Sequence, residues 1–166
     1  HKSEAMPQSL CRISAASMTS PLSSLTVVAG AAVISRLSIT GGSGNDTLAG
    51  GNIADTITGG AGVDTFIFNT KLVTTNLDSI TVFSVTDDTI WLENTGIFTA
   101  LTTLGTLGST SFHTGTAAGD GLDRIIYNST NGSLFYDADG TGSTAAVQFA
   151  TLTTGLTLAN TDFWVI

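Results

Sequence analysis

Three aspartates stand nine residues apart in this chain, each in the same turn-forming context. Asp46, Asp55 and Asp64 are each the sixth residue of a nine-residue unit, and the three units fill residues 41–67 without a gap. Carboxylate and carbonyl oxygens are the ligands that Ca²⁺ prefers, and glycine lets the backbone approach an ion closely. The shared pattern, G-G-x-G-x-D-x-U-x with U a large apolar residue, therefore predicts calcium binding.

The spacing predicts which units share an ion. Six residues of each unit favour a turn and three favour a short strand, so that two units complete one coil of 18 residues and the first and third turns lie at the same edge. A calcium ion takes about six to eight oxygen ligands, more than one turn supplies. The predicted primary site therefore combines two carboxylates with nearby backbone carbonyls: Gly41, Ser43, Asp46, Gly60, Gly62 and Asp64. The two carboxylates would bind the same ion, or ions above and below one layer.

The second unit departs from the pattern, because Ile53 stands where the other units have their third glycine. A β-branched residue is poorly suited to a left-handed backbone conformation. We expect a weaker second site here, formed by Asp55 with Asp78 from the stretch that follows the repeats. Two alternatives stay open, a glycine-rich coil without metal and acidic residues that serve only solubility. Repulsion between stacked carboxylates argues against a coil without a cation.

The elements that must position these residues are strands. Abundant Gly, Thr and Ser with few charges favour strands and tight turns. Leu48, Ile57 and Phe66 would point into a narrow core between two parallel sheets, which only stacked repeats can bury. The predicted fold is all-β, a short parallel β-roll capped by a β-rich C-terminal region. The strands expected in that cap are 78–83, 88–92, 124–127, 133–136 and 145–152, with a turn at 137–142 that is not an EF-hand, because its twelfth position is Gln148.

Composition divides the chain into three parts. Residues 1–37 form a poorly defined leader, 38–68 the repeats and 69–166 the cap. The apolar run Leu25–Ile34 is too short to span a bilayer and lacks the flanks of a signal peptide, so we expect a strand that caps the repeats. Leu37-Ser38-Ile39 keeps the apolar-polar alternation of a strand, and we interpret it as a repeat that has lost its calcium turn.

Several functions are disfavoured by composition. The net charge of −8 disfavours nucleic acid, which needs clustered Lys and Arg. The single cysteine, Cys11, allows no internal disulfide, so metal is the expected means of holding the fold. His113 has no second His or Cys nearby and is expected in a loop. Neither an H-E-x-x-H nor a G-x-S-x-G motif is present, so we expect no enzyme.

The chain from residue 41 to residue 166 resembles the C-terminal region of RTX proteins, the haemolysin-type calcium-binding proteins exported by type I secretion. The likeness is carried by the repeats, by the segment 78–90 and by the block 123–140. It implies a parallel β-roll with Ca²⁺ in its turns, an extracellular location, and an export signal at the C-terminus, where Asp162 precedes four apolar residues.

The resemblance implies a secreted module that folds on calcium binding after export, with calcium ions and the type I secretion machinery as partners and no stable membrane span. A second hypothesis is the C-terminal remnant of a secreted RTX hydrolase or toxin whose catalytic domain is absent. A third is a surface-layer or adhesive module that calcium stiffens.

Overall fold

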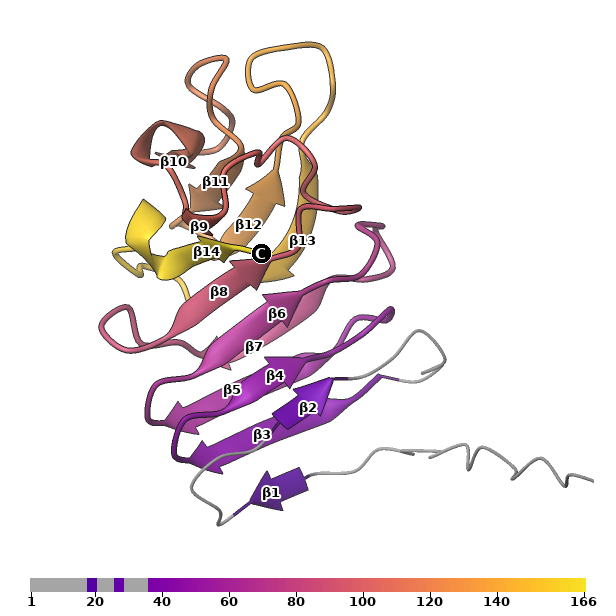
Figure 1. Ribbon diagram of the computed structural model, residues 1–166, viewed down its shortest axis with the longest axis vertical. Coiled ribbons are helices and arrows are strands. Elements are labelled where there is room, and N and C mark those ends of the chain that lie inside the picture. The colour runs from indigo at the N-terminus through magenta and orange to yellow at the C-terminus, as the bar shows by residue number, and fades with distance from the viewer. Residues whose placement is uncertain (1–17, 21–25, 29–35) are drawn as a thin grey trace, which may run out of the picture.

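The computed structural model describes residues 18–20, 26–28 and 36–166, which form an all-β protein with two short 3-10 turns. Two sheets lie face to face, one of eight strands in the order β1-β3-β5-β7-β13-β12-β11-β10 and one of six in the order β2-β4-β6-β8-β14-β9. The long axis of the molecule runs across the strands, from β1 to the C-terminal elements (Figure 1).

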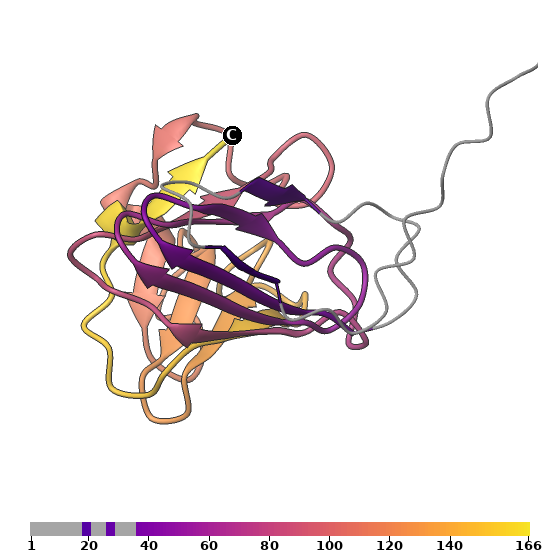
Figure 2. The same cartoon turned by 90° about the horizontal axis from the view of Figure 1, so that it is seen from below.

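The first eight strands alternate between the two sheets. The odd-numbered strands lie in the eight-stranded sheet and the even-numbered ones in the six-stranded sheet, and each pairs in parallel with the next of its own sheet. Their bounds are β1 Met18–Ser20, β2 Thr26–Val28, β3 Ser38–Ser43, β4 Thr47–Ala49, β5 Thr56–Ala61, β6 Thr65–Phe68, β7 Asp78–Val82 and β8 Thr89–Leu92. Figure 2 looks along this stack from its N-terminal end.

The repeats pair in the register that their spacing predicts. Ile39 lies opposite Ile57, and Leu48 opposite Phe66, each pair 18 residues apart. Leu48 and Phe66 are fully buried and Ile57 is nearly so. Burying such a side chain contributes about 1.5–3 kcal/mol. These side chains therefore lie in an apolar column between two mixed sheets, whose strands are parallel in this part of the chain.

The C-terminal strands extend both sheets. The remaining elements are β9 Gly105–Thr106, η1 Ser109–Ser111, β10 Phe112–Thr114, β11 Ile125–Asn128, β12 Ser133–Tyr136, β13 Val147–Thr151, η2 Asn160–Asp162 and β14 Phe163–Val165. β13 joins β7 in parallel, and β14 joins β8 in the same way. The strands expected at 124–127, 133–136 and 145–152 are present as β11, β12 and β13, and β12 pairs antiparallel with both of the others.

An aromatic cluster joins this cap to the coil. The rings of Phe68 and Phe149 meet edge to face with centroids 5.0 Å apart. Phe98 meets Phe149 at 5.2 Å and Tyr136 at 5.1 Å in the same geometry. Such pairs stabilise by about 0.5–1.5 kcal/mol beyond the area they bury. The parallel ladders therefore run through the predicted boundary at residues 68–69 without a break in the core.

Some expectations need correction or fall outside the described residues. β1 and β2 lie within the predicted leader and pair with β3 and β4, whereas the other residues of 1–35 lie outside the described part, including most of the apolar run. The prediction of a loop at His113 was wrong: it lies in β10, beside Ile126, because β10 extends the sheet as an edge strand. No helix in the described part is long and apolar enough to cross a membrane.

Candidate metal centre in the turns

The turns of the coil gather at its two edges. Segments 41–46, 59–64 and 83–88 each lead from the eight-stranded to the six-stranded sheet, and we call them the first turn stack. Segments 50–55 and 69–77 lead back, and we call them the second turn stack. Each stack therefore combines segments that are one coil apart in sequence.

A ladder of carboxylates runs through the first turn stack. The backbone N–H of Asp46 donates to Oδ1 of Asp64 at 3.0 Å, and the N–H of Asp64 donates to Oδ1 of Asp88 at 3.0 Å. All three side chains are buried. The structure thus brings Asp46 and Asp64 together as predicted and adds Asp88 above them.

The glycines of this stack leave room for oxygen atoms. A Cβ on Gly41 would lie 2.1 Å from Oδ2 of Asp46 and 2.6 Å from the carbonyl oxygen of Gly59. A Cβ on Gly59 would lie 2.2 Å from Oδ2 of Asp64. The first glycine of a unit is therefore needed because the carboxylate of its own turn occupies the place of a side chain.

The middle glycines bring neighbouring turns into backbone contact. A Cβ on Gly60 would lie 2.0 Å from the carbonyl oxygen of Gly42, and one on Gly62 would lie 2.1 Å from that of Gly44. The φ angles of Gly60 and Gly62 are 118° and 129°, values that residues with a side chain rarely adopt. Ser43, also predicted in the site, ends β3 opposite Ala61 with its side chain exposed.

Each turn stack contains a buried carboxylate oxygen that has no hydrogen-bond partner among the described residues. These oxygens are Oδ2 of Asp64 in the first stack and Oδ2 of Asp55 in the second. An unsatisfied buried acceptor costs about 1–3 kcal/mol, and more when it is charged. A bound cation would remove that cost, and carboxylate and carbonyl oxygens are the ligands that Ca²⁺ takes. The residues present therefore fit a calcium ion.

Burial and neighbouring carboxylates raise the pKa values of Asp64 and Asp88 in this stack. Burial is the main cause of the raised pKa of Asp64, and the carboxylates of Asp88 and Asp46 add to it. The pKa of Asp88 is also raised, first by burial and further by Asp87. Hydrogen bonds from the ladder N–H groups act in the opposite direction. The charged forms are disfavoured as long as no cation lies beside them.

The second turn stack contains a similar carboxylate ladder, but different side chains pack around it. The N–H of Asp55 donates to Oδ1 of Asp78 at 2.9 Å, and the N–H of Leu37 donates to Oδ1 of Asp55 at 2.7 Å. The predicted pairing of Asp55 with Asp78 therefore exists. Burial is the main cause that raises the pKa of Asp78 to about 7, with the Asp55 carboxylate adding to it.

Side chains from the longer segment 69–77 close this stack. The hydroxyl of Thr70 donates to the carbonyl of Gly51 at 2.8 Å. The amide of Asn76 donates to the Thr70 hydroxyl at 3.0 Å and to the carbonyl of Lys71 at 3.3 Å. The Arg36 charge also lies near enough to lower the pKa of Asp55, although burial, the larger cause, raises it.

Sequence reasoning did not place Asp88 in the site. Its signal was present, because Asp88-Thr89-Ile90 repeats the Asp-Thr-apolar order that enters the strand in each of the three units. In its turn, Oδ2 of Asp88 accepts the N–H of Ser84 at 2.8 Å, while the Asp87 carboxylate accepts the hydroxyls of Ser84 and Thr86. Residues 83–88 lack the glycine pattern of the repeat units, so the sequence pattern alone does not identify this segment as a related turn.

The carboxylates do not form a compact metal-binding cluster. Within the described ranges, no group of three or more His, Cys, Asp or Glu side chains converges on one point. The ladder explains this, because it spaces the carboxylates one strand apart, about 4.8 Å in a sheet. Any ion in these turns would take most of its ligands from backbone carbonyls.

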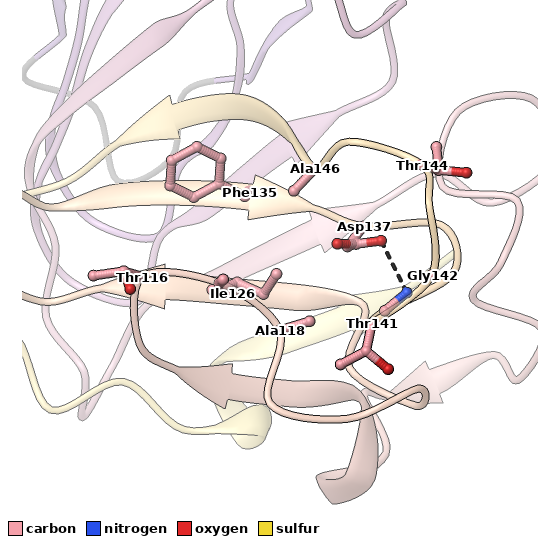
Figure 3. A pocket seen from close by; sticks show the side chains of 11 residues that line it. Thr116, Ala118, Ile126, Phe135, Asp137, Thr141, Gly142, Thr144 and Ala146 are labelled. Carbon is pink, nitrogen blue, oxygen red and sulfur yellow. Dashed lines mark hydrogen bonds between the residues drawn. The ribbon is translucent and has the colours of Figure 1, made fainter.

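A separate hollow of about 430 Å³ lies on the outer side of the C-terminal strands. Ile126 and Phe135 line it from β11 and β12, with hydroxyls of Thr116, Thr141 and Thr144 around them (Figure 3). Asp137 is already engaged there, since its Oδ1 accepts the N–H of Asp139 at 3.1 Å and that of Gly140 at 2.9 Å. This agrees with the predicted turn at 137–142.

Comparison with known proteins adds no assignment. No known family model matches the chain, and no curated protein matches it. Any function must therefore be argued from the residues and their geometry.

Proposed function

We propose that the chain is a calcium-binding module of the RTX type, whose alternating parallel strands form a β-roll and whose first turn stack holds the ion. The observation that carries the proposal is the buried Oδ2 of Asp64, which has no hydrogen-bond partner among the described residues. This oxygen lies so close to Gly59 that no residue with a Cβ would fit there. Asp46 and Asp64 would hold the ion with carbonyls of the glycine turns. Asp55 and Asp78 would form a weaker second site.

Calcium supplies positive charge between these oxygens when bound. The rest follows from the chain itself. Without a cation, repulsion along the ladder and the conformational freedom of the glycines favour the unfolded state. In a compartment with millimolar calcium, binding to the folded state alone stabilises it by mass action. Coupling of this kind would make folding depend on the calcium concentration.

Circular dichroism with and without calcium tests this proposal. We expect a β spectrum and a cooperative thermal transition in millimolar Ca²⁺, and loss or a large downward shift of that transition in EGTA. Magnesium at the same concentration is the control, since its smaller ion needs near-octahedral geometry and should stabilise much less. Identical transitions in calcium and EGTA would refute the proposal.

Secretion through a type I exporter is the second part of the proposal. It is supported by the resemblance, which implies an export signal where Asp162 precedes four apolar residues. Phe163 and Val165 are also buried in β14, so these residues serve the fold as well. Export of the whole chain with and without residues 162–166, measured in the medium, tests the signal. Equal export of both forms would refute it.

A binding module that is not an enzyme is proposed here, since the described residues offer stacked carboxylates and backbone oxygens rather than a nucleophile with a base. His113 contacts Asp123 at 3.6 Å from Nδ1 to Oδ2, and that carboxylate already accepts the N–H groups of Gly119 and Asp120. This arrangement stabilises the segment that follows β10.

A further inference from the structure

Both tryptophans of the chain lie side by side on the outer face of the six-stranded sheet. Trp91 in β8 is in register with Trp164 in β14 and with Ile67 in β6. Their neighbours along each strand are buried in the core, so these three side chains face outward. Trp164 is 42% exposed, which is unusual for so large an apolar side chain.

The strand positions beside this aromatic row are uncharged and carry hydroxyls, and the nearest charged residue along β8 is Glu93, which follows the strand. A parallel row two residues earlier consists of Thr47, Thr65 and Thr89, in register across β4, β6 and β8. Beyond Trp164 lies Thr106 of β9. The outward positions of β4, β6, β8 and β14 hold no Lys, Arg, Asp or Glu. Asp162, which precedes β14, is buried and accepts the N–H of Ala159.

The ring of Trp164 extends toward β9. A Cβ on Gly105 would lie 3.9 Å from its Cζ2 and Cη2 atoms, and Gly105 has a φ of 97°. The glycine thus gives the indole ring space to lie across the neighbouring strand. The aromatic surface therefore extends across the strands, from β8 over β14 to β9.

We propose that this face, formed by Ile67, Trp91 and Trp164, binds a neutral β-1,4-linked polysaccharide. The C–H faces of its sugar rings would stack on the indoles, and its hydroxyls would reach the threonine row. One sugar unit of such a chain is about as long as the strand spacing of about 4.8 Å. A chain that crosses the strands would therefore follow the row, and the Trp164 ring, which lies toward β9, would extend its stacking surface. This proposal does not depend on calcium binding in the turns.

Other occupants fit less well. Nucleic acid and anionic membrane surfaces require basic side chains, which these strands do not present. A stable dimer buries about 800 Å² per partner, whereas a fully buried aromatic side chain contributes about 150–250 Å². Two partly exposed tryptophans and one isoleucine therefore provide too little surface for a second copy.

Tryptophan fluorescence of the full chain tests the proposal directly, because both fluorophores lie in the row. We expect cellohexaose, added in millimolar calcium, to shift the emission with a saturating concentration dependence. Trp164→Ala should weaken binding about tenfold or more, since stacking and the lost area together exceed about 1.4 kcal/mol. Val82→Ala is the matched control, because Val82 is 48% exposed on β7 of the other sheet.

Two further measurements keep the outcome decisive. Thermal unfolding of both variants checks the fold, and Trp91→Phe replaces Trp164→Ala if the latter does not fold. Co-sedimentation of the wild type with microcrystalline cellulose should capture it, and excess cellohexaose should release it. Unchanged emission together with no co-sedimentation would overturn the proposal. Equal affinity of Trp164→Ala, or a dimer that this substitution dissociates, would overturn it as well.

Discussion

The two turn stacks both contain units of the same repeat but are closed in different ways. In the first stack, glycine turns lie in direct backbone contact, and Asp46, Asp64 and Asp88 follow one another with their own N–H groups as donors. In the second stack, Thr70 and Asn76 donate hydrogen bonds into the turn, and Arg36 lies near Asp55.

This difference indicates what each stack needs from outside. The Arg36 charge lowers the pKa of Asp55 in the second stack, although Asp55 itself raises the pKa of Asp78. In the first stack, the carboxylates of Asp88 and Asp46 both raise the pKa of Asp64. A carboxylate deprived of water needs a partner charge or hydrogen bonds in return. Calcium should therefore matter more to the first stack than to the second.

The largest effect is expected from breaking the backbone contact in the first stack. Gly60→Ala would place a Cβ 2.0 Å from the carbonyl oxygen of Gly42 at a φ of 118°. We expect a loss of about 3 kcal/mol or more in the free energy of unfolding in calcium, measured by urea denaturation. Gly96→Ala is the control, since its nearest atom would be 3.9 Å away. Similar losses for both variants would contradict the described packing.

The second largest effect is expected from removing one negative charge in the first stack. Asp64→Asn keeps an oxygen that can accept the N–H of Asp46 but removes the negative charge. In calcium we expect it to lose about 2–3 kcal/mol of stability, because a ligand of the ion is weakened. In EGTA it should be neutral or stabilising, since a buried and repelled charge is gone.

Asp78→Asn is the matched variant in the second stack. Its calcium-dependent loss should be smaller than that of Asp64→Asn in the same urea titrations. Equal or larger calcium dependence for Asp78→Asn would reverse the comparison between the stacks.

A pH dependence of moderate size is expected without calcium. The pKa of Asp78 is raised from 3.8 to about 7, so the folded state holds this proton more tightly than the unfolded state. The resulting stability is fully present below about pH 3.8 and is lost as the pH rises through 7. In EGTA, the free energy of unfolding should therefore fall between pH 5 and pH 8, by our estimate of about 1 kcal/mol or more. Asp78→Asn should flatten that slope, and an unchanged slope would show that other groups cause it.

The smallest effect is expected from the hydrogen bonds that close the second stack. Asn76→Ala removes the donor to the Thr70 hydroxyl and to the Lys71 carbonyl. We expect a loss of about 1 kcal/mol, equal in calcium and in EGTA. Thr74→Ala, an exposed position in the same segment, should change stability little. A loss for Asn76→Ala that appears only in calcium would mean that this amide supports an ion.

Much of the coil could be predicted because its signals are local and periodic. The nine-residue spacing requires Asp46 and Asp64 to lie on one edge and Leu48 and Phe66 in one column, and both pairs are found in these places. The pairing of Asp55 with Asp78 followed from the same counting, although a longer segment intervenes.

The rest depends on contacts that no local pattern encodes. Asp88 joins the carboxylate ladder although its turn lacks the glycine pattern. The hydrogen bonds of Thr70 and Asn76 in the second stack form only because the nonrepetitive segment 69–77 folds over the second unit. The parallel pairing of β13 with β7 and of β14 with β8 joins residues more than 70 positions apart. Such pairings are determined by the fit of the whole core.

The most direct test of the central claim is a crystal structure grown in millimolar calcium, with anomalous difference density measured at a wavelength where calcium scatters. The account predicts a peak between the turns 41–46 and 59–64, within ligand distance of Asp46 or Asp64 and of glycine carbonyls, and a weaker peak or none in the second stack. Ordered turns without a peak, or calcium only in the second stack, would contradict it.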